Sequence, residues 1–96
     1  MPAYVVLYRF TDDGRKDLKE TVRRAAEVRK TNEERGFKVL GHYWTQGRFD
    51  LVTIVEAPDE DAMMAGLFNI AEAGNVHSET LRAFSDEDMD RILSRT

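Results

Sequence analysis

Hydrophobic and polar residues alternate along this chain with two different periods, which predict strands in some segments and helices in others. Dense runs of β-branched and aromatic residues predict four strands, at residues 3–10, 37–46, 49–57 and 76–84. Apolar residues recurring every three or four positions predict helices at residues 15–35 and 58–73, and a short terminal helix that carries Met89, Ile92 and Leu93. The order β-α-β-β-α-β with a terminal helix is the ferredoxin-like arrangement of the α+β class.

Glycine and short polar residues mark where these elements should begin and end. We expect the first helix to end at Gly36 and the second at Gly74, because glycine readily adopts the left-handed conformation that closes a helix. Ser85 and Asp88 resemble a capping box at the start of the terminal helix, with aspartate in place of the usual glutamate. Residues 47–48, a glycine followed by an arginine, predict a two-residue type II′ turn between the second and third strands.

The predicted hairpin places apolar residues on both faces of the sheet. Counting outward from the turn gives three pairs on one face: Trp44 with Leu51, His42 with Thr53, and Leu40 with Val55. The pairs on the other face are Thr45 with Asp50, Tyr43 with Val52, and Gly41 with Ile54. Two helices cover only one face. We therefore expect a homo-oligomer in which the second face packs against the sheet of another copy.

We assign the face that carries His42, Trp44 and Thr53 to the space between the two sheets. Its mixture of large apolar side chains with an imidazole and a hydroxyl is typical of a pocket lining. On this assignment the Trp44 ring is buried against the partner sheet, and its indole N–H bonds a carbonyl, a threonine or a ligand. The opposite assignment, in which this face lies under the helices, is the alternative.

The second predicted helix is apolar around most of its circumference. Its apolar residues are Met63, Met64, Leu67, Phe68, Ile70 and Ala71. A helix that packs on one sheet needs a single apolar stripe. The excess is therefore expected to contact either the terminal helix or a neighbouring subunit.

Composition narrows the functions that this pattern can serve. A length of 96 residues fits a single domain over residues 1–96, and the absence of cysteine excludes disulfides, thiolate metal sites and thiol nucleophiles. A net charge of −4, without a basic cluster interleaved with aromatic residues, argues against a nucleic-acid partner. No apolar run approaches a membrane span and no secretory signal is visible, so we expect a cytoplasmic protein without a membrane partner.

Side chains able to bind a ligand are spread over the predicted strands and their hairpin. The candidate ligand-binding residues are His42, Trp44, Thr53, Arg9, Glu79 and Asp50. Glu79 and Asp50 would act as general bases only if they were buried in a dry pocket. The histidines lie on different strands without metal-ligand spacing, and no phosphate-binding glycine loop or nucleophile elbow occurs. We therefore expect no metal and no cofactor, and we identify no catalytic residue.

Three segments resemble the GYD domain family, and together they span essentially the whole chain. They are the opening strand at 4–12, the hairpin YWTQGRFDLV at 43–52, and the closing strand GNVHSETLRAFS at 74–85. Gly47 and Asp50 keep the glycine and aspartate of the naming motif, whereas Phe49 stands in place of its tyrosine and offers no hydroxyl. The resemblance implies a dimeric α/β barrel and no settled activity. The hairpin is also similar to that of the effector-binding domains of leucine-responsive regulators, where it contributes to small-molecule binding between subunits.

These observations favour a homo-oligomeric module, a dimer or larger, that binds a small hydrophobic or aromatic molecule between its sheets or at subunit contacts. Two alternatives stay open. One is a cofactor-independent enzyme on the same barrel, resembling small monooxygenases or isomerases. The other is a structural assembly unit, which would need no pocket.

Overall fold

The computed structural model describes residues 1–96 and contains one antiparallel sheet of four strands in the order β2-β3-β1-β4. The strands are β1 (Ala3–Phe10), β2 (Lys38–Trp44), β3 (Leu51–Glu56) and β4 (Val76–Ala83). The helices are α1 (Asp12–Arg15), the 3₁₀ helix η1 (Leu18–Glu20), α2 (Thr21–Glu34), α3 (Glu60–Ala73) and α4 (Asp86–Leu93). This order confirms the predicted ferredoxin-like α+β fold.

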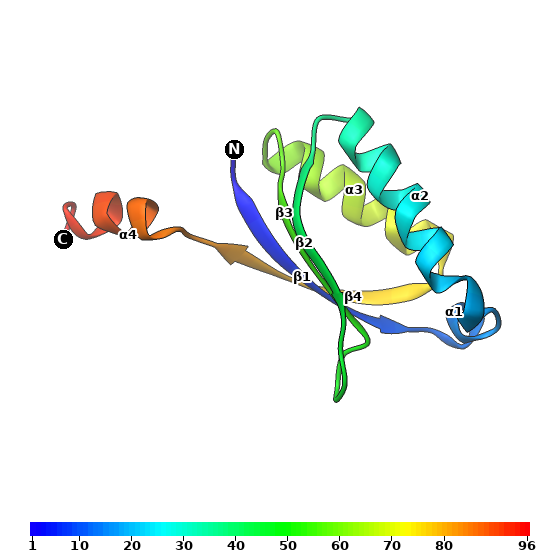
Figure 1. Ribbon diagram of the computed structural model, residues 1–96. Coiled ribbons are helices and arrows are strands. Elements are labelled where there is room, and N and C mark those ends of the chain that lie inside the picture. The colour runs from blue at the N-terminus through cyan, green and yellow to red at the C-terminus, as the bar shows by residue number, and fades with distance from the viewer.

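Helices α2 and α3 lie on one face of the sheet and leave the other face bare (Figure 1). Helix α4 stands apart from them, beyond the far end of β4. Of the two contacts expected for the apolar excess of α3, the one with the terminal helix does not form. Met64 and Phe68 of α3 stay exposed, and Phe68 keeps 64% of its surface open to solvent. None of the helices combines the length and apolarity needed to cross a bilayer.

The predicted end of α3 at Gly74 and the predicted capping box of α4 are confirmed, whereas α3 begins at Glu60 rather than at residue 58. The side chain of Asp59 accepts a hydrogen bond from the backbone N–H of Ala62 at 2.7 Å and so begins α3. Gly74 closes α3 in the left-handed conformation with φ of 76°. Ser85 and Asp88 form both bonds of the predicted capping box.

The first helix does not run over 15–35 as predicted; it is divided into α1, η1 and α2. Gly14 lies so close to β4 that a Cβ atom there would be 2.0 Å from the carbonyl oxygen of Asn75. Thr11 reinforces this junction, because its hydroxyl donates to the carbonyl of Gly74 at 2.6 Å. Asp17 then leaves the helical region, with φ −129° and ψ 55°. Tertiary contacts with the start of β4 thus override the helical pattern.

The hairpin between β2 and β3 keeps most of the predicted register but differs at both ends. Trp44 pairs with Leu51 and His42 with Thr53 as expected. A bulge between Val39 and Gly41 places Val39, rather than Leu40, opposite Val55. The ladder ends at Trp44 and Leu51, so the connection from 45 to 50 is longer than the predicted two-residue turn. Gly47 lies within it at φ 97°, a positive value as predicted.

The core lies on the face of the sheet beneath the helices. Its buried residues are Tyr4, Val6, Val55, Ala57 and Met63, with Tyr8, Phe37, Val39 and Leu67 packed around them. Thr53 lies opposite Val6, and Leu51 lies opposite Tyr8, so both share this face.

Our assignment of the His42, Trp44 and Thr53 face to the space between sheets is therefore wrong, and the alternative holds: this face lies under α2 and α3. Both faces have apolar side chains, and alternation alone does not identify the face that the helices cover. The open face has Val5, Leu7, Tyr43, Val52, Ile54 and Leu81 at the paired positions of the four strands.

Candidate functional site

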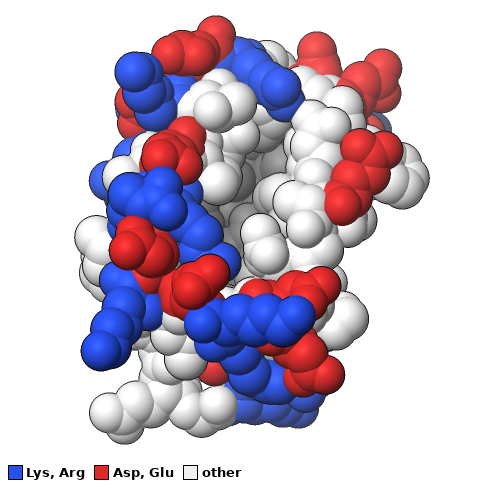
Figure 2. All heavy atoms as spheres, turned by 90° about the vertical axis from the view of Figure 1, so that its right-hand side faces the viewer, with Lys and Arg blue, Asp and Glu red and all other residues white.

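A cleft of about 170 Å³ lies between α2, α3 and the sheet. Figure 2 views the molecule from the side on which the helices lie, and it shows a hollow with uncharged atoms at its floor. Helix α2 has no fully buried residue, so it does not seal the space over β2 and β3. The ferredoxin-like arrangement thus leaves an opening beside its own core.

Apolar side chains make up most of the cleft wall. The strands contribute Tyr8, Phe10, Val39, Leu51 and Val76, and the helices contribute Ala25, Val28, Ile70 and Ala73. On α2 the lining positions are 21, 24, 25, 28, 29 and 32, which is the spacing of a single helix face. An apolar floor with a few polar groups is the usual composition of a small-molecule site.

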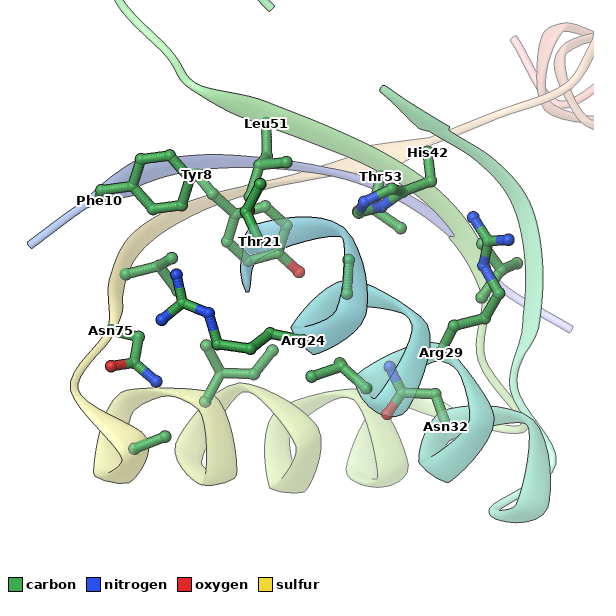
Figure 3. A pocket seen from close by; sticks show the side chains of 16 residues that line it. Tyr8, Phe10, Thr21, Arg24, Arg29, Asn32, His42, Leu51, Thr53 and Asn75 are labelled. Carbon is green, nitrogen blue, oxygen red and sulfur yellow. The ribbon is translucent and has the colours of Figure 1, made fainter. Parts of the chain in front are cut away.

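Thr53 and His42 lie side by side where the sheet borders the cleft (Figure 3). Its Oγ1 lies 3.0 Å from Nδ1 of His42. Burial raises the pKa of the Tyr8 phenol, and a side-chain hydrogen bond with Thr53 opposes this shift. Thr53 and His42 therefore form a hydrogen-bonded pair, and with the Tyr8 hydroxyl they place polar groups in a largely apolar wall.

His42 is held in its neutral form by its surroundings. Burial lowers the pKa of its imidazole, and the positive charge of Arg29 lowers it further. The Nε2 atom of His42 is covered and has no hydrogen-bond partner in the chain. The ring of Trp44 stands perpendicular to the imidazole, with 4.8 Å between the ring centroids.

Trp44 lies at the edge of the cleft and connects β2 to α2. Its indole Nε1–H donates to Oγ1 of Thr21 at 3.2 Å, so a threonine, one of the three kinds of partner expected, takes this N–H on the helix side of the sheet. The ring keeps 43% of its surface exposed and faces the helices rather than a partner sheet. Because Trp44 is the only tryptophan, its fluorescence reports on this edge of the cleft.

Cationic and amide side chains stand around the cleft, without any carboxylate. Arg24, Arg29, Asn32 and Asn75 line it, and no aspartate or glutamate does. Figure 3 shows Arg24 directed toward the Asn75 end, whereas Arg29 and Asn32 lie toward the His42 end. No group of histidine, cysteine and carboxylate side chains suited to a metal ion occurs in the chain.

The remaining sequence candidates lie elsewhere. Arg9 and Glu79 belong to the open face, where they border a second hollow of about 370 Å³ with His77 and Arg48. Asp50 lines neither hollow: its Oδ2 accepts the backbone N–H of Phe10 at 2.8 Å. The backbone N–H of Asp50 in turn donates to the carbonyl of Tyr8 at 2.8 Å. The aspartate of the hairpin motif therefore anchors the loop to the end of β1.

The structure thus brings together His42 and Thr53, with Trp44 at the edge, and separates them from Arg9, Glu79 and Asp50. Sequence reasoning missed Tyr8, Arg29 and Asn32, which complete the cleft. The charges on α2 alone indicate a solvated helix face. The helical spacing of Arg29 and Asn32 relative to Ala25 is the signal that places them on one side of the helix.

Comparisons with known proteins agree with this fold and with the sequence motifs. The GYD domain family matches residues 4–93. The chain is 33% identical over 90 residues to a protein of Thermus thermophilus named glutamine synthetase and cystathionine beta-lyase binding protein, a match that covers 93% of this chain and 95% of that protein. The crystal structure of FFRP-DM1 has a similar fold, with a TM-score of 0.62 at 16% identity, over 88% of this chain and all of that one. The chain therefore belongs to the GYD domain family.

Proposed function

We propose that this chain is a homo-oligomeric binding module that holds a small molecule in the cleft between α2, α3 and the sheet. The observation that carries the proposal is a largely apolar cleft that includes the hydrogen-bonded pair of Thr53 and His42 and the phenol of Tyr8. The site differs from the one expected between two sheets, because the mixed face lies under the helices of its own chain.

Two features of the surface support self-association. The open sheet face carries apolar side chains from all four strands, and Tyr43 on this face keeps 60% of its surface exposed. Helix α4 extends from the end of β4 with Met89 and Leu93 exposed. Water-exposed apolar surface on this scale is typical of a contact with another protein chain.

Steric filling of the cleft tests the binding site. Ala25 lines the cleft, whereas its neighbour Ala26 is exposed and does not. We expect benzyl alcohol, benzamide or benzoate to change the fluorescence of Trp44 on binding to the wild-type chain. The substitution Ala25→Leu should abolish this response, and Ala26→Leu should retain it. Binding that survives Ala25→Leu, or no response to any of the three compounds, would contradict a small-molecule site in the cleft.

A second candidate function is docking onto a metabolic enzyme. It is favoured by the name of the 33% identical relative, which binds glutamine synthetase and cystathionine beta-lyase. On this chain Met64 and Phe68 of α3 offer an apolar stripe that its own helices leave uncovered. We expect co-migration with one of these two enzymes in size-exclusion chromatography, and its loss in Phe68→Ser. Co-migration that persists in Phe68→Ser would show that the stripe of Met64 and Phe68 is not the contact surface. No co-migration of the wild type would exclude docking onto these enzymes as a function.

A further inference from the structure

The charge of the cleft wall differs in sign from the charge of the whole chain. The protein carries 18 aspartates and glutamates and has a net charge of −4. Yet none of these carboxylates is among the 16 residues that line the cleft, whereas Arg24 and Arg29 are. A wall with cationic groups and no anionic ones favours an anionic ligand and disfavours a cationic one.

The two arginines are not equivalent. The guanidinium of Arg24 already donates to the backbone carbonyls of Gly14 and Asp17, each at 3.2 Å. Arg29 makes no side-chain hydrogen bond and no ion pair within the chain, and neither does the side-chain amide of Asn32. Figure 3 places Arg29 and Asn32 at the same end of the cleft, with the guanidinium of Arg29 near His42 and Asn32 on the helix side. This end therefore presents hydrogen-bond donors that the fold itself leaves unused.

The volume of the cleft and the residues of its wall limit the size and type of the apolar part of the ligand. A protein cavity of about 150 Å³ accommodates one benzene molecule, and this cleft measures about 170 Å³. The rings of Tyr8 and Phe10 form part of the wall. Aromatic side chains favour edge-to-face or offset contacts with another ring. A single six-membered aromatic ring thus fits the apolar part of the cleft.

We propose that the cleft binds a small aromatic carboxylate, with the ring on the floor near Tyr8 and the carboxylate on Arg29 and Asn32. This inference rests on the proposed function, because it names the ligand class of the same site. A planar guanidinium can donate two parallel hydrogen bonds to a carboxylate, which an amide or alcohol of the same shape does not accept equally well. The end of the cleft with Arg29 and Asn32 then selects an anionic ligand, and the apolar wall with Tyr8 and Phe10 selects an aromatic ring.

Three probes and two variants test the proposal on the full chain by isothermal titration calorimetry. The probes are benzoate, its neutral counterpart benzamide, and acetate, which lacks the ring. A hydrogen bond to a charged group contributes about 1.5–3 kcal/mol, so we expect benzoate to bind about tenfold or more tightly than benzamide. Acetate should bind more weakly than benzoate, because it leaves the floor unfilled.

The variants identify the group that recognises the carboxylate. Arg29→Gln should weaken benzoate binding by about tenfold and leave benzamide binding unchanged. Lys30→Gln is the matched control, because it removes the same charge from the adjacent position, which does not line the cleft; it should change neither affinity. Circular dichroism checks that both variants stay folded.

The outcomes separate this inference from the proposed function. Equal affinity for benzoate and benzamide, or equal loss of both in Arg29→Gln, would overturn the aromatic carboxylate while a binding site in the cleft stands. Equal affinity for benzoate and acetate would show that only an anion is recognised and would also overturn the inference. Failure of all ring compounds to bind would overturn the inference and the proposed function together.

Discussion

At the scale of single residues, Thr53 supplies the hydrogen-bond partner of one ring nitrogen of His42. Its Oγ1 lies 3.0 Å from Nδ1 of that imidazole. Thr53 of β3 and Thr80 of β4 both pair with Val6 of β1, one from each side of that strand. Thr53 and Thr80 therefore occupy matched positions on the same face, but only Thr53 has side-chain partners for its hydroxyl.

The matched pair gives a direct prediction. Thr53→Val should lower the free energy of unfolding by about 1–3 kcal/mol, because it leaves the partly buried Nδ1 of His42 without a partner. Thr80→Val makes the same chemical change and should lower the free energy of unfolding by a smaller amount. Urea denaturation of the two variants measures the difference. Equal destabilisation would show that the hydrogen bonds of Thr53 contribute nothing beyond the bulk of the side chain.

The neutral state of His42 gives a second prediction, in which stability depends on pH. Burial first, and then Arg29, lower the pKa of His42 below its ordinary value of 6.5. The unfolded chain therefore binds this proton more readily, so stability rises with pH between the two pKa values and falls as the pH drops below about 6.5. We expect the loss in unfolding free energy between pH 7.5 and 5.5 to be smaller in His42→Gln than in the wild type.

The other histidine serves as the control for this pH effect. His77 lies exposed on the open face, opposite Arg9 in the sheet. In the Leu81→Lys background, which keeps the open face free of a second copy, His77→Gln should retain the full loss of stability that its parent shows on acidification. If His42→Gln and the wild type lose the same amount, burial does not hold His42 in its neutral form.

At the scale of elements, the end of α3 and the start of α4 were easier to predict from sequence than the continuity of the first helix. Gly74 and the capping box of Ser85 with Asp88 were identified from sequence because caps are local: the residue that closes or opens the helix supplies the bond itself. The division of residues 15–35 was not predictable, because it depends on Gly14 packing against Asn75, which lies 61 positions away in the chain. The spacing of apolar residues indicates that a helix is favourable in this segment. It carries no information about a contact with a residue far away in the chain.

The junction of α1 with β4 gives a third prediction. A Cβ atom on Gly14 would lie 2.0 Å from the carbonyl oxygen of Asn75, and that oxygen also accepts the backbone N–H of Thr11 at 3.1 Å. Gly14→Ala must therefore displace backbone at the end of the cleft, and we expect it to lower the free energy of unfolding by at least about 2 kcal/mol.

Gly66 of α3 is the control for this substitution. A Cβ atom there would meet Phe37 at 3.7 Å, an ordinary contact distance. Gly66→Ala should be neutral or stabilising by up to about 1 kcal/mol, because alanine favours the helix over glycine. Thermal denaturation ranks the two variants. A Gly14→Ala chain as stable as the wild type would mean that the junction does not constrain α1.

At the scale of the whole molecule, the sequence predicted an apolar surface on both sides of the sheet but did not identify which side the helices cover. The predicted pairing of His42 with Thr53 is confirmed. Pairing shows which residues share a face of the sheet, but it does not show which face the helices cover. The bulge at residues 39–41 adds to the ambiguity, since it places Val39 in the core and leaves Leu40 exposed. His42, Trp44 and Thr53 of the predicted residues therefore lie together, but under the helices of one chain rather than between two sheets.

The same two-sided pattern still argues for self-association, now through the opposite set of residues. Leu81 of β4 lies opposite Val5 of β1 on the open face and is 48% exposed. If this face packs on a second copy, sedimentation equilibrium at micromolar concentration should give a mass of at least twice 11.0 kDa. Leu81→Lys should shift the equilibrium to the monomer, because it buries an unpaired charge in the contact. Val22→Lys alters an exposed valine on α2 and should leave the mass unchanged. A wild-type chain that sediments as a monomer would contradict the packing of the open faces but would leave the cleft in place, because one chain forms it alone.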